Sequence, residues 1–366
     1  MAEKKVLLIW PAVHVNMVAV MRAFFAFGYE ARIIVRGYGY GWQLLDEGVV
    51  VHVSSFSDEH GGMDKARLSA YLEEFGPDIV MVRTEVNNSL HQIVSYVSKR
   101  YRTISCDQMP ARMPLSYRSM KGELLHFLLR MKLGLRNTVL TPVSHKGNGR
   151  ALALGFKHSY PKPVVYRGDE REKSRDGRLR IMMVGKYRQA RKRHRWILRA
   201  LHRIDTPVEL VMAGIGLDSV NKDNHEALRN IAEIKRMMDE INRETKHVVK
   251  MRNDIPPDDM HGIYLSSDIF VLPSENEPFA YSPLEAMAAG CAVVVPSDNG
   301  SSCYVVDGQN GLIFDTRSFD DFCGKVRALV GDGELRARLQ ENARETIRKN
   351  HTYEEFIRRF EEVAGG

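Results

Sequence analysis

Hydrophobic and polar positions alternate along this chain in a way that predicts short buried strands, each followed by an amphipathic helix. The first apolar run, at 5–10, has the length of a buried strand, and residues 17–27 have helical spacing and end at Gly28. Further strands are expected at 31–35, 49–53, 79–82, 101–105 and 139–144, with helices at 89–99 and toward Leu154. This alternation is typical of a parallel sheet covered by helices on both faces.

The same pattern restarts after residues 160–178, which mix prolines with dense charge and show no periodicity. Strands are expected at 179–184, 208–212, 247–251, 269–272 and 291–295, with the longest helix at 226–245 and amphipathic helices at 334–349 and 353–364. We therefore expect an α/β protein of two doubly wound halves, 1–160 and 179–350, joined by a linker at 161–178 and followed by a terminal helix within 351–366.

Composition and length are those of an ordinary globular protein. The 366 residues are 44% hydrophobic and 27% charged, which is enough apolar surface for two cores and excludes a disordered chain. No apolar run reaches the roughly 18 residues of a membrane span, and the N-terminal segment lacks the longer apolar region of a signal peptide. A cytoplasmic protein is expected, with reduced thiols at positions without metal-ligand spacing: Cys106, Cys291, Cys303 and Cys323.

The positive charge of the chain suits an anionic partner. The net charge is +7, which is compatible with nucleotide phosphates, an acidic membrane surface or nucleic acid. Residues 124–136 are apolar with a few cations, and they are equally consistent with an interfacial helix on anionic lipid and with a core helix of the first half.

The most informative segment is a polar loop between two apolar runs. The run at 268–273 leads into a loop that carries Glu275 and Glu277, a small-residue helix follows, and a second apolar run begins at Cys291. Such a strand-loop-helix-strand unit presents its loop at the carboxyl end of the sheet, where open α/β folds bind ligands. Helix-opening N–H groups in the loop are suited to a phosphate.

This segment resembles the signature of family 4 retaining glycosyltransferases of the GT-B fold, in which two glutamates are separated by seven residues. Here the signature reads Glu277-Pro-Phe-Ala280 and then Leu284-Glu-Ala-Met-Ala-Ala-Gly-Cys-Ala-Val-Val294, with alanine in place of the usual glycine at 280 and of the usual proline at 292. The resemblance implies two Rossmann-like domains facing across a cleft, with the acceptor bound by the first domain and the donor by the second. It also implies that the last helix crosses back to the first domain.

The resemblance assigns roles within this segment. Glu277 accepts hydrogen bonds from the donor sugar, while the N–H groups of Phe279, Ala280, Tyr281 and Ser282 face sugar and phosphate. Glu285 binds the ribose hydroxyls of the nucleotide. Residues 282–285 also have the pattern of a capping box, with serine before the helix and glutamate three residues later, so Glu285 has a structural alternative.

A second motif, Gly185-Lys-Tyr-Arg-Gln-Ala-Arg-Lys-Arg193, follows the first strand of the second half and is similar to the phosphate loop of the same family. On that match Lys186 replaces the conventional arginine, Lys192 is the conventional lysine and Arg193 replaces a glycine. Positive groups are needed here because the nucleoside diphosphate leaving group gains charge as the glycosidic bond breaks. A solvated basic loop is the alternative, and the neighbouring arginines are expected to be solvated or to face a membrane: Arg188, Arg191, Arg193 and Arg195.

Weaker candidates complete the predicted site. Gly214 and Gly216 form a turn where the family places the nucleotide, and Arg252 ends a strand near the expected base, although a plain turn explains the glycines equally well. Asp107 stands after the strand where many relatives carry a histidine, and it either orients a substrate or caps a turn. His14, after the first strand, is a candidate for the acceptor side or a packed histidine.

We therefore predict a metal-independent, retaining hexosyltransferase with no cofactor, whose partners are a nucleotide-sugar and a carbohydrate or lipid-linked acceptor in polysaccharide, lipopolysaccharide or glycolipid synthesis. An anionic membrane surface at the inner face is a further candidate partner, and nucleic acid is not expected. A Rossmann oxidoreductase would need a glycine-rich turn after the first strand, and 7–14 contain no glycine. A non-catalytic protein that binds a polyanion or a membrane is the remaining alternative.

Overall fold

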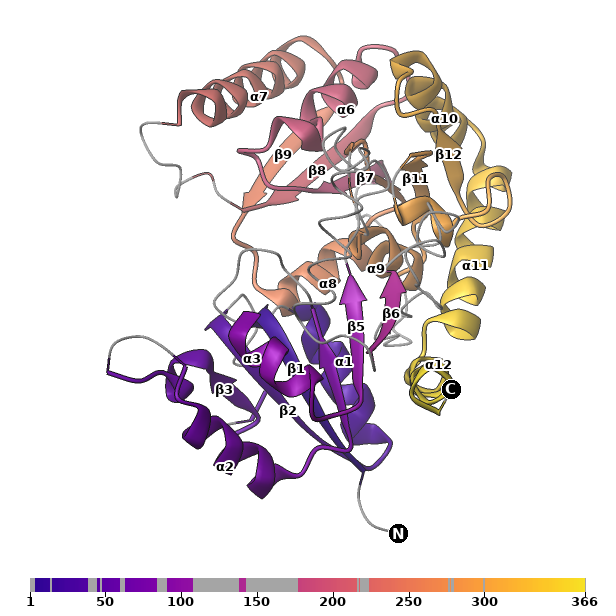
Figure 1. The fold of residues 1–366 in the computed structure, drawn as a ribbon. Coiled ribbons are helices and arrows are strands. Elements are labelled where there is room, and N and C mark those ends of the chain that lie inside the picture. Colours follow the sequence, from indigo (N-terminus) through magenta and orange to yellow (C-terminus); the bar gives the residue numbers. More distant parts are fainter. Residues whose placement is uncertain are drawn as a thin grey trace, which may run out of the picture. The chain divides into compact units, whose positions relative to one another are not determined.

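The structure is a computed structural model, which describes residues 4–13, 15–38, 45–46, 48–59, 63–83, 91–107, 138–142, 177–215, 217, 224–275, 277, 280–298 and 300–365 (Figure 1). The chain divides into two compact units. Unit 1 comprises Met1–Met109, Met113–Pro163 and His351–Gly366, and unit 2 comprises Pro110–Arg112 and Val164–Asn350. Each unit contains a six-stranded sheet.

All strands of unit 1 pair in parallel, in the order β3-β2-β1-β4-β5-β6. The strands are β1 (Lys4–Val13), β2 (Tyr29–Tyr38), β3 (Val50–His52), β4 (Ile79–Val82), β5 (Thr103–Asp107) and β6 (Thr138–Pro142). Side chains of β1 alternate between two cores: Leu8 and Trp10 pack with α1 (Val15–Ala26) and α12 (Tyr353–Gly365), whereas Leu7 and Ile9 pack with α2 (Lys65–Phe75) and α3 (His91–Ser98). Helices therefore cover both faces of this sheet, as the alternation predicts.

The helix α12 follows unit 2 in the sequence but completes the core of unit 1. The rings of Phe360 and Phe356 lie 4.9 and 5.4 Å from the ring of Phe24 in α1, in edge-to-face arrangements. Glu361 accepts hydrogen bonds from the Tyr29 hydroxyl at 2.7 Å and from the Lys4 ammonium at 3.0 Å. These contacts join the carboxyl-terminal helix to the first two strands of the chain.

Unit 2 repeats the topology, with parallel strands in the order β12-β11-β10-β7-β8-β9. The strands are β7 (Leu179–Val184), β8 (Val208–Gly214), β9 (Val248–Asn253), β10 (Ile269–Val271), β11 (Ala292–Pro296) and β12 (Leu312–Phe314). In both units the first and fourth strands are neighbours, and the chain proceeds from them in opposite directions across the sheet. This is the switch point at which doubly wound folds bind ligands.

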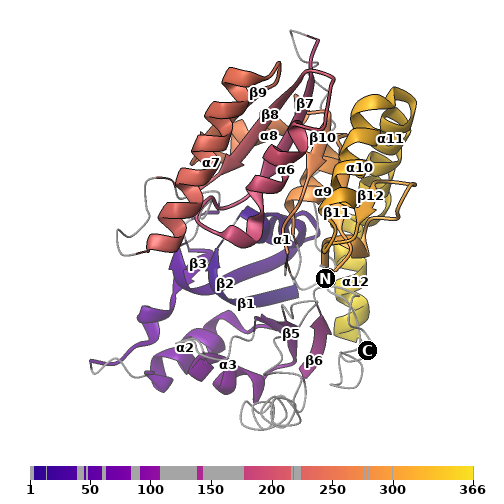
Figure 2. The same ribbon diagram turned by 90° about the horizontal axis from the view of Figure 1, so that it is seen from above.

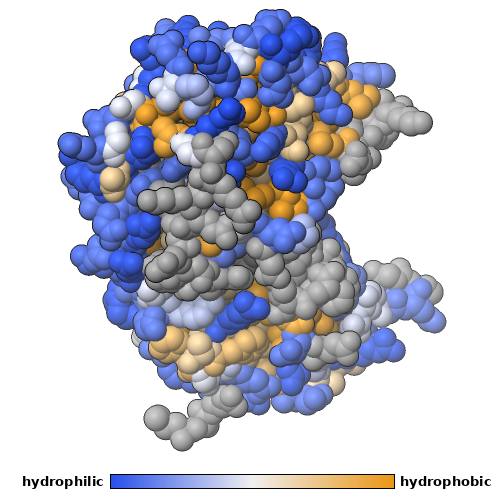
Figure 3. Space-filling model, turned by 180° about the vertical axis from the view of Figure 1, so that it is seen from behind, coloured by the Kyte–Doolittle hydropathy of each residue, from blue (hydrophilic) through white to orange (hydrophobic). Residues whose placement is uncertain are grey.

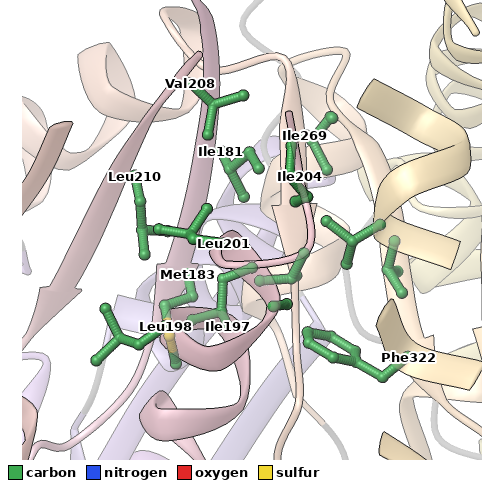
Figure 4. Close-up of a cluster of buried hydrophobic side chains, with 14 of the residues drawn as sticks. Ile181, Met183, Ile197, Leu198, Leu201, Ile204, Val208, Leu210, Ile269 and Phe322 are labelled. Carbon is green, nitrogen blue, oxygen red and sulfur yellow. The ribbon is translucent and has the colours of Figure 1, made fainter. Parts of the chain in front are cut away.

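Alternating side chains of β7 separate the two cores of unit 2. Ile181 and Met183 belong to a core under α6 (His194–Leu201), α7 (His225–Glu244) and α10 (Phe319–Gly331), which Figure 4 shows with Leu201 and Phe322 among its members. Met182 belongs to the opposite core, under α8 (Pro257–Leu265), α9 (Ser282–Ala288) and α11 (Gly333–Asn350). The helices α6 and α7 run side by side, as Figure 2 shows. The fold class predicted from the alternating pattern is therefore confirmed for both units.

Three elements were not predicted, although two of them carry terminal signals. The helix α2 begins after Asp64, whose carboxylate accepts the N–H groups of Ala66 and Arg67, and it ends at Gly76 in the left-handed region with φ 61°. The helix α10 begins after Ser318, which caps the N–H of Asp321. The strand β12 has only three residues, too few for a recognisable alternation.

Hydrophilic residues predominate on the face shown in Figure 3, and hydrophobic residues form smaller patches between them. Among the described residues, no helix has the length and apolar character needed to span a membrane. The candidate interfacial helix at 124–136, the expected helix toward Leu154 and almost all of the expected linker lie outside the described residues.

Candidate active site

Two loops that carry predicted site residues of unit 2 meet at its switch point. The phosphate loop follows β7, and the loop with Glu277 follows β10; these two strands pair directly through Ile269–Ile181 and Phe270–Met182. Because parallel strands end at the same edge of the sheet, the two loops emerge next to each other. A backbone hydrogen bond joins them, from the Glu275 N–H to the Arg191 carbonyl at 3.0 Å.

Tyr187 anchors the phosphate loop to the sheet. Its side chain is fully buried, and its hydroxyl lies 2.6 Å from the Met212 carbonyl and 2.8 Å from the Arg252 carbonyl, at the ends of β8 and β9. The Asn230 amide of α7 donates to the Tyr187 carbonyl at 2.7 Å. Gly214 is required beside this tyrosine, because a Cβ there would lie 2.2 Å from the Gly185 carbonyl oxygen. The structure thus gives Gly214 a packing role.

Glu277 and Lys192 form the centre of the candidate site. The Lys192 ammonium donates to Oε2 of Glu277 at 2.6 Å, and both side chains are largely buried. The Arg191 guanidinium donates to the same oxygen at 2.9 Å. The structure gives Oε1 of Glu277 no hydrogen-bond partner among the described residues, so one oxygen of the carboxylate is available to a ligand.

Burial and charge act against each other in this cluster. Burial works to raise the pKa of the Glu277 carboxyl, but the charges and hydrogen bonds of Lys192 and Arg191 outweigh it, and the pKa is lowered. Burial lowers the pKa of the Lys192 ammonium, and the charge of Glu277 opposes this. The carboxylate is therefore ionised at neutral pH, and it competes with any anionic ligand for the two cations.

The expectation that Arg193 is solvated is wrong, whereas Arg191 is partly exposed and also pairs with Glu277. Arg193 has φ 53° and ψ 39°, in the left-handed region. The family phosphate loop that this motif resembles has glycine at the same position. The Arg193 guanidinium donates to Glu275 and, at 2.7 Å, to the Thr316 carbonyl, and it lies 4.4 Å from the centre of the Trp196 ring. These three contacts offset the unfavourable backbone conformation. Arg188 and Arg195 are exposed, as expected.

His194, the first residue of α6, is buried below the phosphate loop. It is 2% exposed, and neither ring nitrogen has a hydrogen-bond partner among the described residues. Its ring centre lies 5.1 Å from that of Tyr187. Burial lowers the pKa of His194 from 6.5 to about 4; the Gly185 backbone opposes the shift and the charge of Lys192 adds to it. His194 is therefore neutral at pH 7.

A buried neutral histidine makes the stability of unit 2 depend on pH. Because the pKa of His194 is about 4 when folded and 6.5 otherwise, the unfolded chain takes up a proton first as the pH falls. The contribution of the neutral His194 side chain to the free energy of unfolding is complete above pH 6.5. About 3 kcal/mol of it is lost as the pH falls from 6.5 to about 4. We expect His194→Phe to flatten the dependence of the free energy of unfolding on pH in this window, measured by urea denaturation.

The control for this prediction is His202→Phe, at the exposed carboxyl end of the same helix. His202→Phe is expected to keep the slope of the wild-type protein. His247, whose pKa burial also lowers, remains in both variants and leaves part of the slope in place. Equal slopes in His194→Phe and in the wild type would contradict the assignment to His194.

Glu285 lies in the first turn of α9, but the predicted capping box does not form. The helix begins at Ser282 and is preceded by Tyr281, and no side chain caps it. The Glu285 carboxylate instead accepts a hydrogen bond through Oε2 from the Tyr264 hydroxyl of α8, at 2.7 Å. Burial raises the pKa of the Glu285 carboxyl, while the Tyr264 hydroxyl and His261 act to lower it.

The other described residues of the predicted site lie on the phosphate loop, on the loop and helix after Glu277, and on β9. Ala280 is buried, and its carbonyl accepts the Tyr304 hydroxyl at 2.8 Å. Tyr281 and Ser282 are partly exposed at the start of α9. Lys186 is exposed on the phosphate loop, and Arg252 is exposed on β9.

Four predicted residues cannot be placed with the cluster. Phe279, Gly216 and His14 lie outside the described residues. Asp107 ends β5 of unit 1, and its side chain is outside the description. Among the described residues, no three His, Cys, Asp or Glu side chains are grouped in an arrangement that could hold a metal ion.

The chain is similar to known proteins over the part that contains this site. Residues 167–346 match the family model of glycosyl transferases group 1. Over 90 residues, the chain is 34% identical to the lipopolysaccharide core biosynthesis glycosyltransferase LpsE of Rhizobium meliloti (strain 1021), which is 25% of this chain and 26% of that protein. The chain thus aligns with about a quarter of the length of the curated relatives that it matches.

Two solved structures are similar over nearly the whole chain. A glycosyltransferase from Rickettsia africae has a TM-score of 0.71 and 16% identity, with 100% of this chain and 99% of that chain covered. HepE of Anabaena, in complex with UDP and glucose, has a TM-score of 0.74 and 12% identity, with 99% and 100% covered. At this identity the similarity establishes the fold, two Rossmann-like units as in GT-B glycosyltransferases.

Proposed function

Because this chain belongs to the glycosyl transferases group 1 family through residues 167–346, we propose that it is a retaining glycosyltransferase that moves a sugar from a nucleotide-sugar to an acceptor hydroxyl. One observation carries the proposal: the carboxylate predicted to bind a sugar and the ammonium predicted to bind a diphosphate meet at 2.6 Å, between two loops of one switch point. A sugar diphosphate needs these two groups side by side, because its hydroxyls and its phosphates are separated by one glycosidic bond.

In the proposed reaction, Oε1 of Glu277 accepts hydrogen bonds from the donor sugar. Lys192 and Lys186 face the diphosphate and stabilise the charge that it gains when the bond to the anomeric carbon breaks. The acceptor oxygen then bonds to the same face of that carbon, and its proton passes to the departing phosphate. Glu285 holds the nucleotide ribose, and the N–H groups at 279–282 support sugar and phosphate. We also propose that the nucleotide lies near Gly216 and Arg252. On the acceptor side, the candidates are His14 and Asp107.

We propose the donor and acceptor classes from the charges of the site and from the relatives of the chain. Fixed cations take the place of a metal ion at the diphosphate, so we propose metal-independent transfer of a hexose without a cofactor. HepE was crystallised with UDP and glucose, which supports a UDP-hexose as the first donor to examine. The name of LpsE supports an acceptor in lipopolysaccharide synthesis. We also propose a glycolipid acceptor as an alternative, and peripheral binding at the inner face of a membrane, which the net charge of +7 favours.

The test is a screen of UDP-, GDP- and ADP-hexoses, first for thermal stabilisation and then for turnover with and without EDTA. Stabilisation by one nucleotide series, turnover that EDTA leaves intact, and product with the anomeric configuration of the donor are the expected results. The contrary result is no response to any donor together with polyanion affinity that falls steeply with salt, which is the behaviour of a non-catalytic basic binding protein.

A further inference from the structure

Glu285 is held by a tyrosine that neither the phosphate loop nor the glutamate signature contains. Tyr264 is 4% exposed in the core between α8 and α9, and its hydroxyl donates to Oε2 of Glu285 at 2.7 Å. The other carboxylate oxygen, Oε1, has no hydrogen-bond partner among the described residues. The carboxylate is therefore fixed by one oxygen and open at the other.

We propose that Tyr264 is a positioning residue for nucleotide binding, because its hydroxyl holds one oxygen of Glu285 and so presents the other oxygen to the ribose. This inference rests on the proposed function, since it needs a nucleotide at Glu285. A hydrogen-bonded carboxylate keeps a single orientation, and a ligand hydroxyl then binds without first having to order it. Tyr264 does not touch the ligand and acts through Glu285 alone.

The surroundings of Tyr264 show that its orientation is fixed by packing. Its ring centre lies 6.2 Å from that of Phe270 in β10, and its carbonyl oxygen is 3.3 Å from the Cys291 thiol, which precedes β11. The titratable or charged groups facing the pair are His261 on α8, Cys291 and Tyr304. On α11, Arg344 lies against Gly290, beyond the carboxyl end of α9.

The Tyr264 hydroxyl also affects the pKa of the Glu285 carboxyl. The Tyr264 hydrogen bond lowers the pKa of a carboxyl that burial raises, and so it favours the charged form that accepts ribose hydroxyls. Loss of the hydroxyl should therefore raise the pH below which nucleotide affinity falls. A purely structural role would weaken binding by the same factor at every pH.

The experiment measures the affinity for UDP-, GDP- and ADP-hexoses, whose diphosphates are esterified at both ends, by calorimetry from about pH 4, near the ordinary pKa of a glutamate carboxyl, up to about pH 8. We expect Tyr264→Phe to bind the preferred nucleotide-sugar roughly three- to tenfold more weakly at neutral pH. We also expect the acid limb of the binding profile, the pH range in which affinity falls as the solution becomes more acidic, to lie at higher pH in Tyr264→Phe than in the wild type. Glu285→Gln, which leaves the tyrosine in place, should abolish the limb.

Tyr304→Phe is the matched control. It removes another hydroxyl from the same core, one that donates its hydrogen bond to the Ala280 carbonyl at 2.8 Å. It should leave the acid limb where it is, whatever its effect on affinity. An unmoved limb in Tyr264→Phe, or a limb that persists in Glu285→Gln, overturns this inference and leaves the proposed function standing. If none of the three nucleotide-sugar series binds the wild-type protein, both fail.

Discussion

Replacing Glu277 with glutamine is expected to lower the turnover number by about 10²–10³-fold, the usual effect of removing one stabilising polar group from an active site. The same change should strengthen binding of a nucleoside diphosphate that carries no sugar. In the wild-type protein the Glu277 carboxylate occupies Lys192 at 2.6 Å and Arg191 at 2.9 Å, and the diphosphate must compete for them. Glutamine removes the competing charge but keeps the size of the side chain.

Two measurements check this prediction. Steady-state kinetics with the preferred donor gives the loss of turnover. Thermal unfolding with and without UDP, GDP or ADP should show a larger stabilisation of Glu277→Gln than of the wild type, because the anion then neutralises a buried cation that has lost its partner. A smaller stabilisation of the variant would mean that Glu277 does not compete with the diphosphate.

Unit 2 contains a matched control for this substitution. Glu209 is also a buried glutamate with two cationic partners, since its Oε1 lies 3.1 Å from Arg180 and 3.2 Å from Lys250. It stands near the start of β8, at the edge of the sheet opposite the predicted site. Glu209→Gln should therefore reduce stability and leave turnover and nucleotide binding near their wild-type values.

Phe360→Ala is expected to destabilise unit 1 by about 3–5 kcal/mol, the usual cost of truncating a buried phenylalanine. Phe360 is 3% exposed and packs against Phe24, Tyr29 and Phe356. The change should appear as loss of hydrogen-exchange protection in β1 and β2. The strands of unit 2 should keep their protection, because they have cores of their own.

The control is Phe25→Ala, in the same helix as Phe24 but 39% exposed. A surface truncation of this kind changes stability by about 0.5 kcal/mol or less. Similar free energies of unfolding for Phe25→Ala and Phe360→Ala would show that α12 adds little to unit 1. Equal loss of protection in both units would show that they unfold as one.

Much of the fold could be predicted because its signals are local. The strand at 79–82 and the strand at 179–184 have the predicted limits, since each is a short, mostly apolar run that follows a charged residue, Asp78 or Arg178. The strand β1 extends three residues beyond its apolar run, to Val13, because it pairs with β2 over that length. The alternating pattern does not predict the helix α2, although Asp64 and Gly76 mark both of its ends.

Only those residues of the candidate site to which the two family motifs assign a role could be predicted from the sequence. Lys192 and Glu277 could be proposed because each stands at a recognisable position after an apolar strand. Arg191 and Arg193 could not, because their partners are more than eighty residues away in the sequence. The sequence offers one signal for these ion pairs. Arg191 and Arg193 are two residues apart, and so are their partners Glu277 and Glu275. Tyr264 gave no signal, because an apolar helix accounts for its presence equally well.

The place of α12 in the sequence has a consequence for biosynthesis. Its residues are translated after all of Val164–Asn350, so the nascent unit 1 waits for its last helix while unit 2 leaves the ribosome. At about 5–20 residues per second this delay is on the order of ten to forty seconds. During that time the apolar surface around Phe24 has no cover from Phe356 and Phe360, and transiently exposed apolar surface is prone to the aggregation that chaperones prevent.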